Sequence, residues 1–437
     1  IHGLCRLYIL FSSLVHGFYL IVLRVLSLGS SLPRVATIAL IALLLISGVV
    51  LQATSFTLLY QALDEDVDSY TNIVILDGFS YFIGSKSGYL VITRLNLLDF
   101  SKGYERVAYH RVLTGNLYIL DVVYEADSLQ VLAASTEETR TALYHITVSP
   151  ASGRVIVDSV VSMPLDFRVL RGSLWRGLAV AVGLWNNSLT VIRASPTGVE
   201  WTTRLGPEPR PAPLVCVSLR SDGAALIAVS SNHGADLYVV SPAGNVVRHL
   251  AYNATAPILI YDCKQIGLAF VIAGGLVLGE LIHPILVYTT LDEPVRAGHT
   301  IIGDMTGVVT AVASEEDKVY AALVTKNSTL VALYKFSLEE GFNLERAVNI
   351  NEVAGREVLG LALAVFNSTL MMTGALMKGS GAYLAVIKYV EEKPRLSESL
   401  ASVLIFSSII VLAAMMIVLV ATFIKKRFRK NKVKEVQ

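Results

Sequence analysis

The stretches Ser149-Pro150-Ala151-Ser152-Gly153, Ser195-Pro196-Thr197-Gly198 and Ser241-Pro242-Ala243-Gly244 repeat one pattern, and their first serines are 46 residues apart, twice in succession. Each stretch follows an apolar, β-branched run and precedes another extended run. Because Pro fixes φ and Gly supplies a positive φ, each unit is predicted to be a strand, a tight turn and a second strand. A repeat of about 40 to 50 residues with several strands is typical of a β-propeller.

The same rhythm continues on both sides of these turns. From about residue 70 to residue 390, apolar runs of strand length alternate with turn residues, and no long helical period appears. We therefore predict an all-β fold over residues 70–392, a seven-bladed β-propeller, with six or eight blades as alternatives. Seven hairpin turns are expected near residues 84–88, 135–141, 183–188, 230–235, 273–275, 324–328 and 376–381.

The last repeat lacks an obvious outer strand of its own. Closed propellers avoid a free sheet edge when a strand from the N-terminal side completes the last blade. Ile73–Leu76 is the candidate for that strand. The acidic residues 56–69 before it are expected to form a solvated stalk, because their spacing does not fit a calcium loop.

Hydrophobic helices are predicted to flank the propeller. The chain of 437 residues is 54% apolar with a mean hydropathy of +0.59, more than an ordinary soluble domain requires. Residues 1–55 contain two apolar runs and are predicted to be an export segment, either a signal peptide or a signal anchor; a membrane hairpin is the alternative. After a linker at 393–399, the uncharged residues 400–424 are long enough to span a bilayer.

Charge is concentrated at the two ends of the chain. The net charge is +1, but residues 425–437 hold seven Lys or Arg against one Glu, and residues 1–34 hold three Arg and no acid. Basic residues beside an apolar segment indicate the cytoplasmic side of a membrane. The sequence therefore predicts a cell-membrane protein with an extracytoplasmic propeller and a cytoplasmic tail, and the mildly acidic body argues against a nucleic-acid partner.

Two further features fit a location outside the cytoplasm. Cys216 and Cys263 are 47 residues apart, about one repeat, so neighbouring blades can place them side by side: two buried free thiols are one interpretation, and a disulfide is the other if the domain lies outside the cell. Asn-x-Ser/Thr sequons, which are candidate glycosylation sites on surface loops, occur at Asn186, Asn253, Asn327 and Asn367.

One repeat resembles a known family more closely than the others. After the Thr197-Gly198 turn, Trp201 follows three residues later, as in the repeats of pyrroloquinoline-quinone-type propellers. The turns at Gly153 and Gly244 lack this Trp, and the Asp usual before the turn is absent. The resemblance implies a propeller fold, which quinone dehydrogenases share with non-enzymatic scaffolds, and no quinone site. The whole architecture is similar to single-pass, propeller-bearing surface proteins of archaea.

A search for reactive groups finds little. The sequence contains no His-Glu-x-x-His, no Cys/His cluster and no phosphate-binding loop, so we predict no catalytic residue, no metal site and no cofactor. Trp185 stands in a predicted turn and is the candidate binding aromatic, although packing between blades also explains a Trp there.

These features favour an interaction role. A rigid propeller that presents many loops and no reactive constellation is expected to bind a protein or glycan partner at the cell surface or in a membrane complex. The alternative is an extracytoplasmic propeller enzyme, a quinone-type dehydrogenase or a carbohydrate-active enzyme. Carboxylates or histidines gathered at the propeller axis would favour that alternative.

Overall fold

The structure, a computed structural model, describes residues 56–137, 140–207, 214–292, 295–303, 305–376 and 381–389. The predicted export segment (1–55), linker (393–399), membrane helix (400–424) and basic tail (425–437) lie outside these ranges. Within the described ranges, helices are limited to the short η1 (Phe100–Lys102) and α3 (Ile350–Ala354). None of the helices in these ranges has the length and apolar character needed to cross a membrane.

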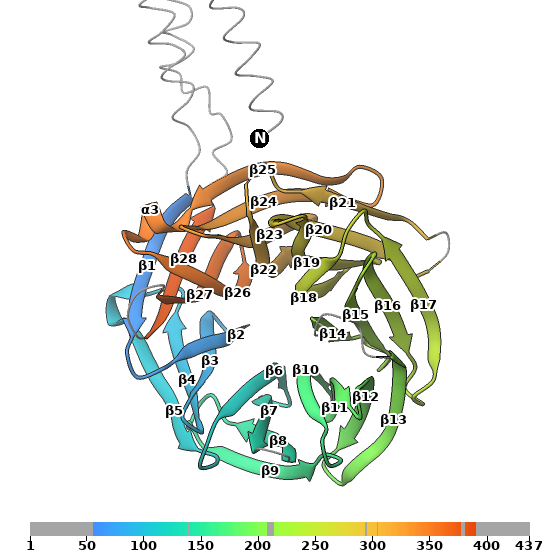
Figure 1. The fold of residues 1–437 in the computed structure, drawn as a ribbon. Helices are drawn as coiled ribbons and strands as arrows, with labels where there is room; N and C mark the ends of the chain where they lie inside the picture. The colour runs from blue at the N-terminus through green and yellow to red at the C-terminus, as the bar shows by residue number, and fades with distance from the viewer. Residues whose placement is uncertain are drawn as a thin grey trace, which may run out of the picture. The chain divides into compact units, whose positions relative to one another are not determined.

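Seven four-stranded antiparallel sheets surround a common axis, so the seven-bladed prediction is confirmed (Figure 1). Each blade is numbered here by its order in the chain, and its first strand lies nearest the axis. Blade 1 contains β2 (Ser69–Leu76), β3 (Phe79–Lys86), β4 (Tyr89–Asn96) and β5 (Tyr104–Arg111). Blade 2 contains β6 (Leu117–Glu125), β7 (Ser128–Glu137), β8 (Arg140–Val148) and β9 (Val155–Ser162). Blade 3 contains β10 (Arg168–Trp175), β11 (Leu178–Trp185), β12 (Ser188–Ser195) and β13 (Gly198–Pro207).

The remaining blades follow the same order. Blade 4 contains β14 (Val215–Leu219), β15 (Ala225–Ser231), β16 (Gly234–Val240) and β17 (Val246–Asn253). Blade 5 contains β18 (Ile258–Ile266), β19 (Ala269–Leu278), β20 (Leu281–Thr290) and β21 (Ala297–Ile301). Blade 6 contains β22 (Gly307–Glu315), β23 (Lys318–Thr325), β24 (Thr329–Ser337) and β25 (Gly341–Asn349). Blade 7 contains β26 (Val358–Phe366), β27 (Thr369–Leu376), β28 (Ala382–Tyr389) and, from the start of the described chain, β1 (Phe56–Asp64).

A strand from the N-terminal side closes the ring, as expected, but it is not the strand that the sequence suggested. β1 pairs with β28 from Phe56↔Tyr389 to Asp64↔Ala382. Ile73–Leu76 belongs instead to β2, the inner strand of blade 1. The stalk prediction for residues 56–69 is therefore wrong over most of its length. Alternate residues of β1 are exposed, the pattern of a strand with one face covered, and only residues 65–68 form a turn.

The hairpin turns agree with the sequence in six blades and differ in the fifth. Gly274 and Gly275 lie inside β19, and the turn comes four residues later, at Gly279 and Glu280. A Cβ on Gly274 would lie 2.1 Å from the carbonyl oxygen of Leu259 in the neighbouring inner strand. Glycine is needed here because two strands approach closely, not because the chain turns.

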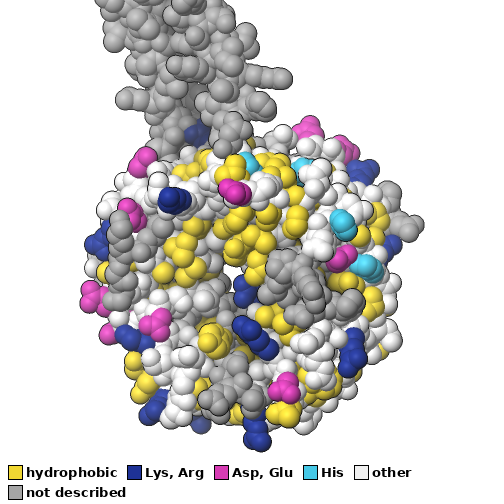
Figure 2. Space-filling model, viewed as in Figure 1, with side chains coloured by type: hydrophobic (Ala, Val, Ile, Leu, Met, Phe, Trp, Pro, Cys, Tyr) yellow, Lys and Arg dark blue, Asp and Glu magenta, His cyan; other side chains and the backbone are white. Residues whose placement is uncertain are grey.

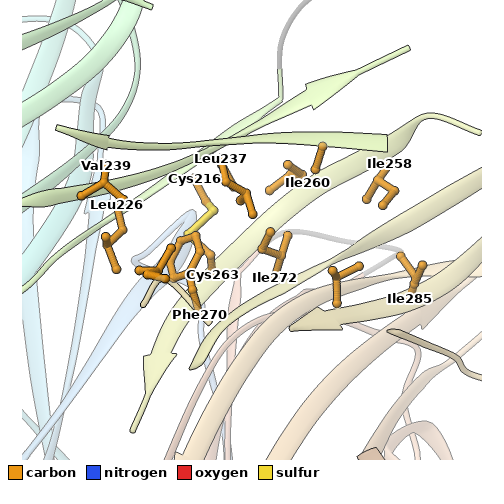
Figure 3. Packing of buried hydrophobic residues seen from close by; sticks show 14 of the residues in the cluster. Cys216, Leu226, Leu237, Val239, Ile258, Ile260, Cys263, Phe270, Ile272 and Ile285 are labelled. Atoms are coloured by element: carbon orange, nitrogen blue, oxygen red, sulfur yellow. A yellow bond between two sulfur atoms is a disulfide. The ribbon is translucent and has the colours of Figure 1, made fainter. Parts of the chain in front are cut away.

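The core lies between the blades rather than in one central cluster. Each blade contributes small and branched apolar side chains to the two interfaces that it shares with its neighbours. Figure 3 shows one of these interfaces, where Cys216, Leu226 and Leu237 of blade 4 meet Cys263, Phe270 and Ile272 of blade 5. Because every blade packs on two others, ring closure buries the last apolar face.

The ring has two faces, which differ in the loops that they carry. The chain-end face carries Phe56 and Tyr389, the β2–β3 turn and its six equivalents, and the three Ser-Pro turns. The distal face carries the β3–β4 turn and its equivalents, together with the connections between successive blades. Phe56 and Tyr389 are paired residues with ring centroids 5.5 Å apart, so the described chain begins and ends at one place.

Candidate functional site

The β19–β20 hairpin presents apolar side chains to solvent on the distal face. Residues 269–276 are all buried, but the exposed fraction rises toward the hairpin tip, to 40% for Leu278 and 52% for Leu281. Between them the tip contains Gly279, with φ of 63°, and one charged residue, Glu280. Exposed leucines at the tip of a rigid hairpin suit contact with another apolar surface.

Glycine allows this hairpin to lie close to the next blade. A Cβ on Gly275 would lie 2.4 Å from Cγ2 of Ile282 and 2.9 Å from Cγ1 of Val308, the latter in the inner strand of blade 6. The hairpin is therefore supported by blade 6 as well as by its own blade. Support at the base of the hairpin limits the movement of the tip, and a pre-organised tip lowers the entropic cost of binding.

Figure 2 shows one face of the ring, in the same view as Figure 1. Hydrophobic side chains gather over the blades that contain β18 to β28, and basic side chains lie beside the central opening. Smaller groups of hydrophobic side chains also appear elsewhere on this face.

Two carboxyl groups occupy the inner strands, where an enzyme site would be expected. Asp121 accepts hydrogen bonds from Ser173 Oγ (2.9 Å) and Leu174 N (2.7 Å) of blade 3. Asp262 accepts one from Val312 N (2.8 Å) of blade 6 in the same way. Burial raises the pKa of both carboxyl groups, and these hydrogen bonds oppose the rise. Both carboxyl groups therefore connect neighbouring blades.

Trp185 lies on the distal face, at the end of β11. Its ring is partly buried against the apolar cluster between blades 2 and 3, and its Nε1 donates to the carbonyl oxygen of Leu165 (3.0 Å). The indole N–H is already used within the propeller. Much of the ring is likewise covered, which leaves Trp185 less suited to stacking on a sugar than an open indole.

Trp201, the residue on which the family resemblance rests, packs against the next repeat. Its Nε1 donates to the carbonyl oxygen of Pro242 (3.0 Å), and its ring lies against Gly244, where a Cβ would be 2.8 Å from Cδ2 of the indole. The Trp of one repeat thus packs against the Ser-Pro turn of the following blade.

Cys216 and Cys263 are joined by a disulfide between the inner strands β14 and β18, with their Cα atoms 5.8 Å apart. Both residues are buried within the interface between blades 4 and 5 (Figure 3). The bond links blades that are also connected by apolar packing and by a hydrogen bond from Ile260 N to Ser230 Oγ (3.3 Å).

The four sequon asparagines are all exposed, but they do not lie together. Asn186 and Asn327 occupy equivalent distal turns of blades 3 and 6, and Asn253 ends β17 on the same face. Asn367 lies on the chain-end face, in the β26–β27 turn.

The described ranges contain no group of three or more His, Cys, Asp or Glu arranged to hold a metal ion. Sequence reasoning missed the exposed β19–β20 tip, because the uncharged run at 266–279 has the composition of two buried strands.

The chain matches no protein-family model and no curated protein. Solved propellers are similar in fold. The WD40 domain of coronin from Toxoplasma gondii is 12% identical, with a TM-score of 0.49 over 78% of this chain and 88% of that one. The β-propeller domain of the Trilobed protease from Pyrococcus furiosus is 9% identical, with a TM-score of 0.45 over 76% and 99%, and the Dos1 propeller is 8% identical, with 0.47 over 74% and 78%. Similarity at this level carries no activity or partner to this chain.

Proposed function

We propose that this protein is a membrane-anchored, extracytoplasmic β-propeller that binds a protein partner through the apolar tip of the β19–β20 hairpin. The observation that carries the binding role is the exposure of Leu278 and Leu281 on a hairpin supported by two blades. An exposed apolar area held rigidly is typical of protein–protein contact sites.

The positions of the first and last residues of the propeller support the anchoring. The apolar segments predicted at 35–51 and 400–424 join the propeller at paired residues, Phe56 and Tyr389. The sequence segments on both sides of the propeller therefore continue from neighbouring residues of it. The basic residues after 424 set the orientation, with the tail in the cytoplasm and the propeller outside.

The disulfide between Cys216 and Cys263 supports the same location. Buried disulfides form and persist in oxidising compartments and are rare where glutathione keeps thiols reduced. A propeller outside the cytoplasm would form this bond during folding.

A protein partner fits the hairpin better than a glycan does. Aliphatic side chains such as Leu278 and Leu281 offer no flat aromatic face for a sugar, and Trp185 is engaged within the propeller. The partner is therefore expected to present an apolar surface of its own. It belongs to the cell surface or to a membrane complex, where the anchored propeller can reach it.

Co-purification of the tagged full chain from gently solubilised native membranes tests this proposal. We expect a stoichiometric partner, and we expect Leu281→Glu to reduce its recovery at least tenfold. Leu98→Glu is the matched control, because Leu98 is 89% exposed but lies on the chain-end face. Equal recovery with both variants would remove the hairpin from the interface, and a protein that purifies alone would remove the binding role.

Topology is tested separately by protease treatment of intact cells. Peptides from residues 80–390 should be released, whereas the tail after residue 425 should be protected. Cleavage of the tail alone would reverse the proposed orientation.

A further inference from the structure

The four sequons differ in the solvent exposure of the Ser or Thr that follows each Asn by two residues. N-linked modification requires both the Asn amide and the hydroxyl two residues later to be accessible. All four Asn side chains are exposed in the part of the chain that the structure describes. The hydroxyl groups, by contrast, range from exposed to fully buried.

Asn253 and Asn327 are the two extremes. Thr255, the hydroxyl residue for Asn253, is exposed in the connection between blades 4 and 5. Thr329, the hydroxyl residue for Asn327, is fully buried. Its Oγ1 donates to the carbonyl oxygen of Val358 and accepts from Gly360 N (3.2 Å), both in the inner strand of blade 7.

The hydroxyl of Thr329 is therefore part of the contact between blades 6 and 7. A second contact closes the same region, since Asn351 Nδ2 donates to the carbonyl oxygen of Asn327 (2.9 Å). An enzyme that needs this hydroxyl cannot reach it while the two blades are packed. It can reach Thr255 in the folded propeller.

We propose that Asn253 and Asn327 are N-glycosylated, and that Asn253 is modified in the folded propeller whereas Asn327 is modified only before blades 6 and 7 pack together. The inference rests on the extracytoplasmic location given under the proposed function. The donor is an oligosaccharide on a lipid phosphate or pyrophosphate. The Asn Nδ2 forms a bond to C1 of the sugar, the C1–O bond to phosphate breaks, the lipid phosphate leaves, and the amide nitrogen loses one proton.

Both glycans would project from the distal face, on blades 4 and 6. These blades lie on either side of blade 5, which carries the β19–β20 hairpin. Asn186 lies on the same face in blade 3, and its hydroxyl residue Ser188 is partly buried, so it is intermediate between the two.

The choice of variants follows from the backbone. Asn186 has a φ of 48° and Asn367 a φ of 49°, conformations that Asn tolerates better than most residues, so replacing either Asn would also strain its turn. Asn253 and Asn327 are not among the residues with positive φ. Asn253→Gln and Asn327→Gln therefore remove the acceptors at little structural cost, and Ser188→Ala is the matched way to remove the Asn186 sequon.

The experiment has two parts. In the first, glycopeptide mass spectrometry of the full chain from native membranes should find glycan on Asn253 and Asn327, and each Gln variant should lose one gel shift. In the second, folded full chain made without glycosylation is incubated with glycosylating membranes. Asn253 should gain glycan and Asn327 should not, while chain that is reduced and unfolded beforehand should gain it at both.

The outcomes separate this inference from the proposed function. If the propeller is accessible outside the cell and Cys216–Cys263 is oxidised, but both asparagines are bare, the glycosylation proposal is wrong and the location stands. If the folded chain gains glycan equally at both sites, the role of Thr329 in the timing is wrong. If the two thiols are free and the propeller is protected from protease, the location and the glycosylation proposal are both wrong.

Discussion

Both carboxylate oxygens of Asp64 accept hydrogen bonds from Nη2 of Arg106, at 2.9 and 2.8 Å. Asp64 is the last residue of β1 and belongs to blade 7, whereas Arg106 lies in the outer strand of blade 1. The Tyr70 hydroxyl donates a further hydrogen bond of 2.5 Å to the same carboxylate, and Asp64 is only 1% exposed. The strand that completes the ring is thus tied to the first blade by a buried ion pair.

Asp64→Asn should destabilise the propeller by about 2 to 3 kcal/mol, because it removes the buried carboxylate that pairs with Arg106 and leaves only the exposed Asp66, 3.9 Å away, to balance its charge. The free energy of unfolding, measured by chemical denaturation, checks this. Glu105→Gln breaks the exposed Arg94–Glu105 pair and is the matched control, expected to cost less than about 1 kcal/mol. Equal effects of the two variants would mean that Asp64 has no special role in closing the ring.

Removing the disulfide should lower the stability of the oxidised protein by about 4 kcal/mol, the loop-entropy value for a loop of this length. The variant Cys216→Ala/Cys263→Ala and reduced wild type should unfold at similar denaturant concentrations. Reductant should not affect the variant further. A large effect of reductant on the double variant would show that its loss of stability has another cause.

Trp201 and Gly244 should be energetically coupled. Trp201→Phe loses the hydrogen bond to Pro242 and is expected to cost about 1 kcal/mol. Gly244→Ala should cost about 1 to 3 kcal/mol, because its φ is 86° and the added Cβ would meet the indole. In Trp201→Ala/Gly244→Ala the clash with the ring disappears. The double variant should therefore lose less stability than the sum of the two alanine substitutions, and strict additivity would contradict the packing described.

His145 should make the propeller less stable as pH falls below about 6.5, the usual pKa of unfolded His. Burial lowers the pKa of His145 in the folded state, and the charge of Asp158 only partly opposes this. Below about pH 6.5, His145 is therefore protonated more in the unfolded chain than in the folded chain, and the equilibrium shifts toward unfolding. Denaturation of wild type and His145→Gln at pH 5 and pH 8 measures the effect, and the stability difference between the two proteins should change with pH. A constant difference would exclude His145 as its source.

Local sequence information was sufficient for most of the architecture. The Ser-Pro turns and the alternating runs have short-range causes, a fixed φ at Pro and a positive φ at Gly, and they predicted the all-β fold, the seven blades and six of the seven hairpin turns. The same local reasoning failed at Gly274 and Gly275, which it interpreted as a turn. Whether a glycine marks a turn or a close approach between strands depends on residues that lie elsewhere in the chain.

The sequence by itself determined that this protein is an all-β repeat with apolar flanks, and it favoured seven units over six or eight, because each unit carries its own strand and turn signals. Only the tertiary structure decided which strand closes the ring, which face carries Asn253 and Asn327, and which hydroxyl of their sequons is buried. The hydrogen bond between Arg106 and Asp64 ties the closing strand to blade 1, and the hydrogen bond from Thr329 to Val358 buries the hydroxyl between blades 6 and 7. Contacts of this kind form only when complete blades pack together. They have no repeating pattern in the sequence, so the sequence alone does not predict them.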